Sequence, residues 1–130
     1  MKFITGGIFA GKYERLCSLG FAPDEIADGR DVPFGEAFAK PALNKLNALI
    51  RRLLAAGEDP MEFVAKQAAL HPDIVIACDE VGCGVVPIEK EERDYREAVG
   101  RISCLLAGRA SSVERIYCGL VTELKPEGKA

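Results

Sequence analysis

The 130-residue sequence contains a single histidine, His71, and its five cysteines include no Cys-x-x-Cys pair. Zinc and iron–sulfur centres need several thiolate or imidazole ligands, so this composition gives such a centre little support. The odd number of cysteines favours reduced thiols. We expect Cys78, Cys104 and Cys118, which lie in apolar segments, to be small buried residues. Cys83 lies between two glycines and is either a reactive or an inert loop thiol.

Long apolar runs and an excess of basic residues are also missing. No run is long enough to cross a bilayer, and the first residues lack the basic, apolar and small segments of a signal peptide. We therefore expect a cytoplasmic protein that has no membrane partner. The formal net charge is −3, so no basic surface is predicted that could bind nucleic acid. Its partners should be small molecules or proteins.

A glycine-rich segment near the N-terminus has the spacing of a phosphate-binding loop. It follows a short apolar segment that predicts a strand. Glycines at Gly6, Gly7 and Gly11 let consecutive backbone amides turn toward phosphate oxygens, and Lys12 supplies a cation for the outer phosphates. A helix that begins at Lys12 adds the positive end of its dipole. These residues predict a binding site for ATP or GTP.

Tyr13 follows the lysine where such loops have serine or threonine, whose hydroxyl binds Mg²⁺. The tyrosine hydroxyl lies too far from the backbone to replace that group simply. This departure weakens the prediction of Mg²⁺ binding, although Tyr13 stays among the candidate nucleotide-binding residues. The alternative interpretation of the whole segment is a glycine turn between a strand and a helix, with a solvated lysine.

A continuous apolar run over 73–78 ends in the acidic pair Asp79 and Glu80. Its length and β-branched residues favour a central parallel strand that is buried on both faces. Because parallel strands end at one sheet edge, the pair should lie beside the glycine-rich loop, where a carboxylate holds Mg²⁺ or activates a hydroxyl. We assign Asp79 and Glu80 as metal ligands, and Lys12 and Glu80 as catalytic residues. The alternative is that these acids merely end a strand.

Apolar residues recur at helical spacing in four segments, 12–19, 41–56, 59–70 and 89–109. Two further strands are predicted over 113–118 and 121–124. Residues 21–40 contain prolines and glycines and show little periodicity, so we expect a long loop with one helical turn at most. The alternation predicts a single α/β domain over 1–125, a small mostly parallel sheet with flanking helices, followed by a disordered tail over 126–130.

Three segments carry a family resemblance: 3–12 with the glycine-rich loop, 80–87 with the sequence Glu-Val-Gly-Cys-Gly-Val-Val-Pro, and 93–101 with three arginines. Together they resemble the adenosylcobinamide kinase / adenosylcobinamide-phosphate guanylyltransferase family of cobalamin biosynthesis. The second segment is the most specific. The resemblance implies a P-loop NTPase-like fold, a homo-oligomer, and a kinase step that moves the γ-phosphate of ATP or GTP to a corrinoid hydroxyl. It also implies guanylyl transfer through a histidine.

Arg93, Arg96 and Arg101 are candidates for binding anionic groups of the substrate, given that kinase step. They alternate with acidic residues on a predicted helix, however, and such a pattern is also typical of a solvated helix face with i,i+4 ion pairs. Both interpretations of the three arginines stay open at the level of sequence.

The chain departs from the family pattern in residues 21–40, which replace a longer stretch that in the family contains the guanylylated histidine. His71 precedes the apolar strand and should lie at the amino edge of the sheet, opposite the glycine-rich loop. We therefore expect an ordinary loop histidine and no guanylyl transfer through it. The resemblance thus implies a corrinoid kinase that uses ATP or GTP. The alternatives are a catalytically inactive nucleotide-binding or regulatory relative, and a fold that acts only as an oligomeric partner.

Overall fold

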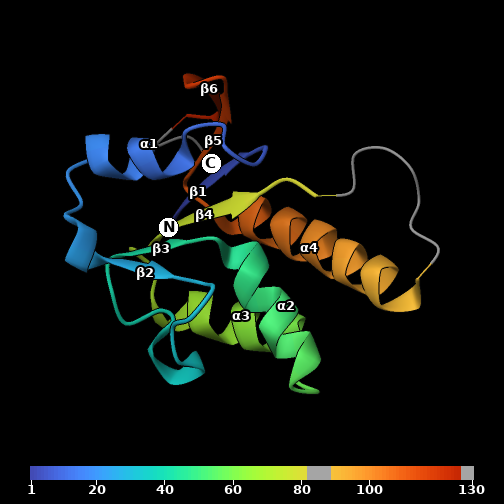
Figure 1. Ribbon diagram of the computed structural model, residues 1–130. Helices are drawn as coiled ribbons and strands as arrows, with labels where there is room; N and C mark the ends of the chain where they lie inside the picture. The colour runs from blue at the N-terminus through green and yellow to red at the C-terminus, as the bar shows by residue number, and fades with distance from the viewer. Residues whose placement is uncertain (82–88, 127–130) are drawn as a thin grey trace.

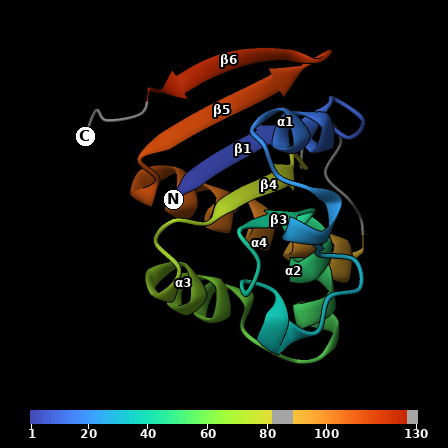
Figure 2. The ribbon, with the colours of Figure 1, turned by 90° about the vertical axis from the view of Figure 1, so that its left-hand side faces the viewer.

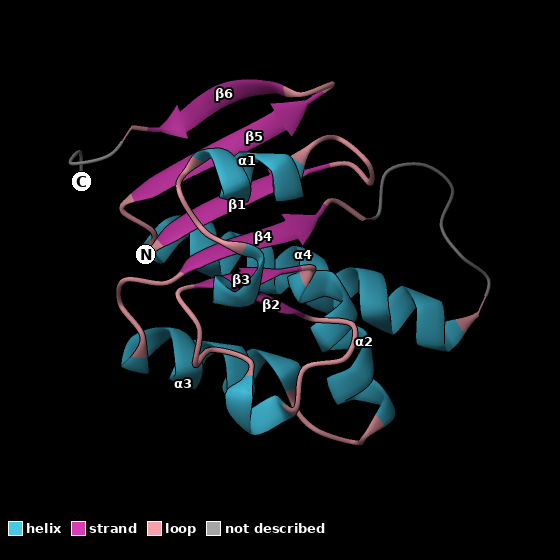
Figure 3. Cartoon of the chain, turned by 60° about the vertical axis from the view of Figure 1, so that its left-hand side comes forward, coloured by secondary structure: helices cyan, strands magenta, loops and turns pink. Residues whose placement is uncertain are grey.

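The computed structural model describes residues 1–81 and 89–126, and in these residues six strands form one sheet in the order β2-β3-β4-β1-β5-β6 (Figure 3). Neighbouring strands are parallel, except that β5 and β6 are antiparallel. The strands are β1 (Lys2–Gly6), β2 (Ile26–Asp28), β3 (Ala42–Asn44), β4 (Val75–Asp79), β5 (Ser112–Tyr117) and β6 (Leu120–Lys125). The expected mostly parallel α/β sheet is confirmed. The loop around Cys83 and the predicted tail beyond Pro126 lie outside the described residues.

Helices cover both faces of this sheet, as Figures 1 and 2 show. The helices are α1 (Lys12–Ser18), α2 (Leu46–Ala55), α3 (Pro60–Leu70) and α4 (Lys90–Arg109). Helix α1 packs on one face through Leu16, whereas α2, α3 and α4 share a cluster of buried residues on the other. Short 3₁₀ turns at Pro23–Glu25 and Phe34–Glu36 flank β2 in the chain. None of the helices in residues 1–81 and 89–126 combines the length and apolar character that a membrane span needs.

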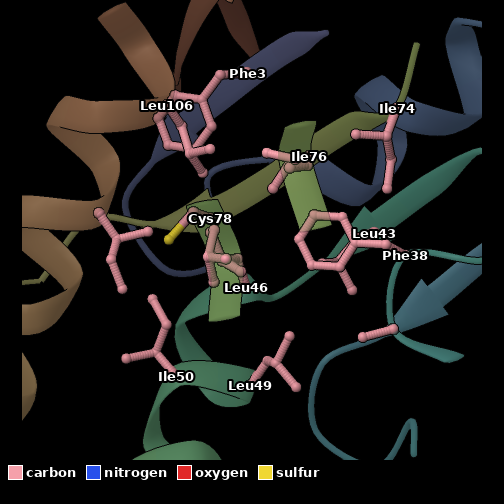
Figure 4. Packing of buried hydrophobic residues seen from close by; sticks show 14 of the residues in the cluster. Phe3, Phe38, Leu43, Leu46, Leu49, Ile50, Ile74, Ile76, Cys78 and Leu106 are labelled. Carbon is pink, nitrogen blue, oxygen red and sulfur yellow. The ribbon is translucent and has the colours of Figure 1, made fainter. Parts of the chain in front are cut away.

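The apolar side chains of β4 pack against the helices on both faces of the sheet. Ile76 and Cys78 point into the cluster that contains α2, α3 and α4, while Val75 and Ala77 point toward α1. Figure 4 shows Ile76 and Cys78 among leucines and isoleucines of the larger cluster. Each fully buried leucine or isoleucine stabilises the fold by about 1.5–3 kcal/mol relative to exposure. A strand buried on both faces therefore fixes the centre of the sheet.

The cysteines follow the prediction only in part. Cys78 is fully buried, and this burial raises the pKa of its thiol to about 12. The prediction that Cys104 and Cys118 are buried is wrong, because both are exposed. Cys104 lies on the outward side of α4, and Cys118 lies at the turn between β5 and β6 with a φ of +50°. An apolar neighbourhood in the sequence did not reveal which side of each element faces the core.

The sequence did not predict the strands β2 and β3. The prediction that residues 21–40 form a loop is wrong for Ile26–Asp28, which form β2. The predicted helix over 41–56 is also wrong at its start, because residues 42–44 form β3 and α2 begins only at Leu46. Lys45 separates the two elements with a left-handed backbone, at a φ of +58°. Strands of three residues are too short to display a period of two. They are defined by their pairing in the sheet, β2 with β3 and β3 with β4.

Glu114 of β5 is a buried charge that ties α1 to the sheet. Its side chain is 2% exposed and accepts two hydrogen bonds from the Arg15 guanidinium, at 2.9 and 2.7 Å. The Lys2 ammonium lies 3.0 Å from the same carboxylate. These partners, Arg15 foremost, hold the pKa of Glu114 below its ordinary value of 4.5 although burial opposes the shift.

We expect Glu114→Gln to lower the free energy of unfolding at pH 7 by about 1.5–3 kcal/mol, the usual contribution of hydrogen bonds to a charged group. Because the native pKa is depressed, this stabilisation is present above pH 4.5 and is lost as the pH falls through the native value. Urea unfolding of both proteins from pH 7 downward measures it, with the exposed Glu58→Gln as control. If the difference in free energy of unfolding between wild type and Glu114→Gln did not change as the pH is lowered, the ionic role of Glu114 would be contradicted.

Candidate functional site

The glycine-rich loop (residues 6–12, called the glycine loop below) connects β1 to α1 at the carboxyl edge of the sheet. A Cβ atom on Gly6 would lie 2.5 Å from the Ile116 carbonyl oxygen of β5. Gly11 has a φ of +106°, and a Cβ there would lie 3.3 Å from the Gly119 Cα. Both positions thus require glycine for close approach to the β5–β6 hairpin, in addition to the backbone freedom that the sequence suggested. Around Gly7, nothing lies within 4 Å of such an atom.

Lys12 and Asp79 form a buried ion pair between the glycine loop and the end of β4. The Lys12 Nζ lies 2.8 Å from Asp79 Oδ1, and the two side chains are 5% and 7% exposed. The same ammonium donates a hydrogen bond to the Gly7 carbonyl oxygen, inside the loop. The two segments that the sequence singled out therefore meet, and the lysine is turned into the loop rather than toward solvent.

Asn47, in the first turn of α2, fixes the position of Asp79. The Asp79 backbone N–H donates to Asn47 Oδ1 at 3.0 Å, and the Asn47 amide donates to Asp79 Oδ2 at 3.4 Å. The Lys45 ammonium lies 3.7 Å from that second carboxylate oxygen. The Asp79 carboxylate is thus in contact with two lysines, Lys12 and Lys45. Their ammonium groups could also bind the oxygens of a phosphate close to Asp79.

A cavity of about 630 Å³ opens at this point, between the start of α1 and the carboxyl ends of β2, β3 and β4. Pockets for small molecules typically measure about 300–1,000 Å³, so its size suits a ligand with phosphate groups. The lining includes both signs of charge, from Lys12, Glu14, Asp28, Arg30, Lys45 and Asp79. Gly11 and Tyr13 also line it, and the Tyr13 side chain is 41% exposed.

Glu80 lies apart from this cavity. Its backbone N–H donates to the Gly6 carbonyl oxygen at 2.7 Å, so the residue is adjacent to the loop. Its carboxylate, however, accepts hydrogen bonds from Arg115 of β5 at 2.8 and 3.1 Å. Of the acidic pair, Asp79 contacts Lys12. Glu80 is directed across β1 toward Arg115 of β5.

The three candidate arginines on α4, Arg93, Arg96 and Arg101, are not among the described residues that line the cavity. Arg101 pairs with Glu97 one turn earlier, at 2.6 Å, and its side chain is 72% exposed. Arg93 is exposed and Arg96 is half-buried on the same helix. The pairing of Arg101 has the i,i+4 geometry of a solvated helix face, which was the alternative interpretation of this segment.

Sequence reasoning missed Asp28, Arg30, Asn44 and Lys45, all of which line the cavity. They follow or end the two short strands that were not recognised. The available signal was weak: Ile26-Ala27 and Ala42-Leu43 are each a pair of apolar residues, and a polar residue follows each pair. Two apolar residues are too few to show the alternation of a strand. The sequence therefore did not predict that these polar side chains lie at the carboxyl edge of the sheet.

Whether Mg²⁺ suits this site depends on Asp79. In residues 1–81 and 89–126, no group of three histidine, cysteine or acidic side chains could hold a metal ion. Glu80 is directed to Arg115, and Tyr13 lacks the short hydroxyl of a serine or threonine. The residues do not fit a resident metal. Asp79 alone fits Mg²⁺ that arrives on a nucleotide, because that ion keeps several waters and needs only one or two carboxylates besides phosphate oxygens.

His71 ends α3 and precedes β4, so it lies at the amino edge of the sheet, opposite the glycine loop. Its ring centroid is 6.1 Å from that of Phe38. The position matches the expectation of an ordinary loop histidine that packs beside the core.

The model of a family described as cobinamide kinase / cobinamide phosphate guanyltransferase matches residues 43–124. The match covers more than half of the chain and runs from β3 to β6, so it includes Asp79, Lys45 and Asn47 and leaves out the glycine loop and β2. A search of curated proteins found no match.

Proposed function

Because the chain belongs to the cobinamide kinase / cobinamide phosphate guanyltransferase family, which acts in cobalamin biosynthesis, we propose that it is a nucleotide-dependent corrinoid kinase. Its fold is P-loop NTPase-like. The proposed reaction moves the γ-phosphate of ATP or GTP to the side-chain hydroxyl of adenosylcobinamide. The observation that carries the proposal is the buried pair of Lys12 and Asp79 in the lining of a cavity of about 630 Å³.

Phosphoryl transfer needs little covalent help from a protein, and its catalysis consists mainly of positioning and of neutralising charge. The glycine loop has the backbone freedom to direct amides toward phosphate oxygens, and Lys12 already occupies its interior. When a phosphate arrives, its oxygens can replace the Gly7 carbonyl as partners of the Lys12 ammonium. Asp79 would hold the Mg²⁺ that accompanies the nucleotide, and this ion would offset the negative charge of the phosphates.

We restrict the proposal to the kinase step. Transfer of a guanylyl group through histidine would need an imidazole near the phosphates, and the only histidine in the sequence packs on Phe38 at the opposite sheet edge. A second candidate is a relative that binds nucleotide without turnover and serves a regulatory role. The exposed Tyr13, which stands in the position of the metal-binding hydroxyl, favours this candidate.

Calorimetric titration with ATP and GTP, with and without Mg²⁺, tests nucleotide binding, and incubation with adenosylcobinamide and γ-labelled nucleotide tests transfer. We expect saturable binding that Mg²⁺ strengthens, and label that appears on the corrinoid with release of nucleoside diphosphate. Binding without transfer would support the inactive relative instead. Absence of binding under all four conditions would reject both candidates.

A further inference from the structure

The carboxyl ends of β4, β3 and β2 lead away from the glycine loop in a row. Asp79 pairs with Gly6 in the register of β4 and β1, and Asp28 pairs with Asn44 in that of β2 and β3. The cavity follows this row, since Lys12, Asp79, Lys45 and Asp28 all line it. It therefore extends beyond the Lys12–Asp79 pair, on the side of β1 that is opposite to β5.

In phosphoryl transfer the attacking and leaving oxygens lie roughly in line, on opposite sides of the phosphorus atom. The lysine of a phosphate-binding loop contacts the outer phosphates, so the γ-phosphate belongs beside Lys12 and Asp79. The rest of the nucleotide then occupies the loop side of that phosphate. The space on its far side, over the ends of β3 and β2, is where the attacking oxygen must come from.

From this geometry, and resting on the kinase function proposed above, we propose that the ends of β2 and β3 form the phosphoryl-acceptor subsite. Asp28 binds the hydroxyl of the acceptor, and Lys45 binds the transferring phosphoryl group from the acceptor side. The ligand class is an alcohol, which for the kinase function proposed above is the side-chain hydroxyl of the corrinoid.

Lys45 has the position and the backbone that this role requires. Its Nζ lies 3.7 Å from Asp79 Oδ2, and its side chain is 25% exposed into the cavity. Its left-handed backbone is held by the Asn44 side chain, whose Oδ1 accepts a hydrogen bond from the Lys45 N–H at 3.0 Å. Such a conformation is strained at a residue other than glycine and is often found at functional sites.

Asp28 offers an ionised acceptor that is preorganised by Arg30. The guanidinium binds the carboxylate through Nε and Nη2 at 2.7–3.1 Å, and the Arg30 N–H adds a bond of 2.9 Å. The hydrogen bonds from Arg30, with a smaller effect of Lys45, lower the pKa of Asp28. These four contacts come from three donors, because the Arg30 Nε–H is shared between the two oxygens. A carboxylate has about four lone-pair sites, so it can accept a hydroxyl where Nε–H keeps only one of its two contacts.

The step balances as follows. The acceptor oxygen forms a bond to the γ-phosphorus, and the bond from that phosphorus to the β–γ bridging oxygen breaks. The electron pair of the broken bond stays on the nucleoside diphosphate. The hydroxyl proton passes to the Asp28 carboxylate and from there to solvent. Lys45 contacts the Asp79 carboxylate and lines the cavity together with Asp28, so its ammonium can offset the negative charge of the transferring group.

Asp28→Asn provides the test, because it keeps the shape of the side chain and removes its basicity. We expect the turnover number for adenosylcobinamide phosphorylation to fall by at least about 100-fold, as for loss of a general base. The dissociation constants of ATP and GTP should stay within about threefold of wild type, a difference of less than about 0.7 kcal/mol. The matched control is the neighbouring Asp31→Asn, an exposed aspartate outside the described lining of the cavity.

Arg30→Ala and Lys45→Asn complete the design. Asparagine tolerates the left-handed backbone, so Lys45→Asn removes the ammonium with little strain, and Lys40→Asn is its exposed control. We expect Lys45→Asn to lower turnover by a larger factor than it weakens nucleotide binding, and Arg30→Ala to cost less turnover than Asp28→Asn.

Three results would overturn the subsite while leaving the kinase function intact. The first is full turnover in Asp28→Asn. The second is an equal loss in Arg30→Ala, since Asp28 would then only hold that arginine. The third is weaker binding of GTP but not of ATP, which would assign Asp28 to the nucleotide base. A wild-type protein that binds no nucleotide would instead reject the kinase function on which the subsite rests.

Discussion

Lys12→Ala is expected to reduce corrinoid phosphorylation by roughly 10²–10³-fold, the usual effect of removing one preorganised donor to a transition-state charge. The dissociation constant for ATP or GTP should rise about tenfold or more, because the ammonium that we propose binds the outer phosphates is gone. The variant also leaves the Asp79 carboxylate buried, with Lys45 as a more distant cation at 3.7 Å. Loss of one partner of a buried pair destabilises a protein by about 3–5 kcal/mol. Calorimetric titration, a transfer assay and urea unfolding measure the three effects.

A double variant separates the chemical effect of Lys12 from the structural one. Lys12→Ala combined with Asp79→Asn removes both charges, so it should recover most of the lost stability and none of the activity. The exposed Lys66→Ala of α3 controls for the loss of a positive charge. If Lys12→Ala kept nucleotide affinity and turnover at the wild-type level, the glycine loop would have no part in binding phosphates.

Gly29→Ala is expected to give the largest loss of stability caused by a single methyl group. Gly29 is buried beside the junction of β3 and α2, and a Cβ atom there would lie 2.0 Å from the Lys45 carbonyl oxygen and 3.2 Å from that of Asn44. These are backbone atoms, so no rotamer change can relieve the clash. The hydrogen bond from the Gly29 N–H to the Asn44 carbonyl oxygen, 2.8 Å long, would be stretched as well.

We expect this overpacking to lower the free energy of unfolding by about 3 kcal/mol, at the upper end of the usual range because backbone must move. The shift also displaces Asp28 and Lys45, which flank the contact, so phosphoryl transfer should fall even where the variant is fully folded. Gly35→Ala is the matched control, since a Cβ atom there meets nothing within 4 Å. Equal urea midpoints for the two variants would show that the loop after β2 can move away from β3 at little cost.

The sequence alone predicted the elements that have a long or distinctive local pattern. The strand before the glycine loop, the apolar run that ends at Asp79, and the helices α3 and α4 were all identified from the spacing of apolar residues. The Asp59 side chain caps α3, because it accepts hydrogen bonds from the first-turn amides of Met61 and Glu62 at 3.0 and 3.2 Å. The parallel arrangement then followed, and with it the meeting of Lys12 and Asp79.

Contacts between distant segments decided the rest. β2 and β3 have three residues each, too few to show a period, and they exist as strands because their backbone groups pair with each other and with β4. That pairing brings Asp28 and Lys45 to the edge of the cavity and requires glycine at position 29. Local patterns record the environment of one element at a time, whereas a site at the ends of several strands depends on which strands become neighbours, and only the folded chain determines this.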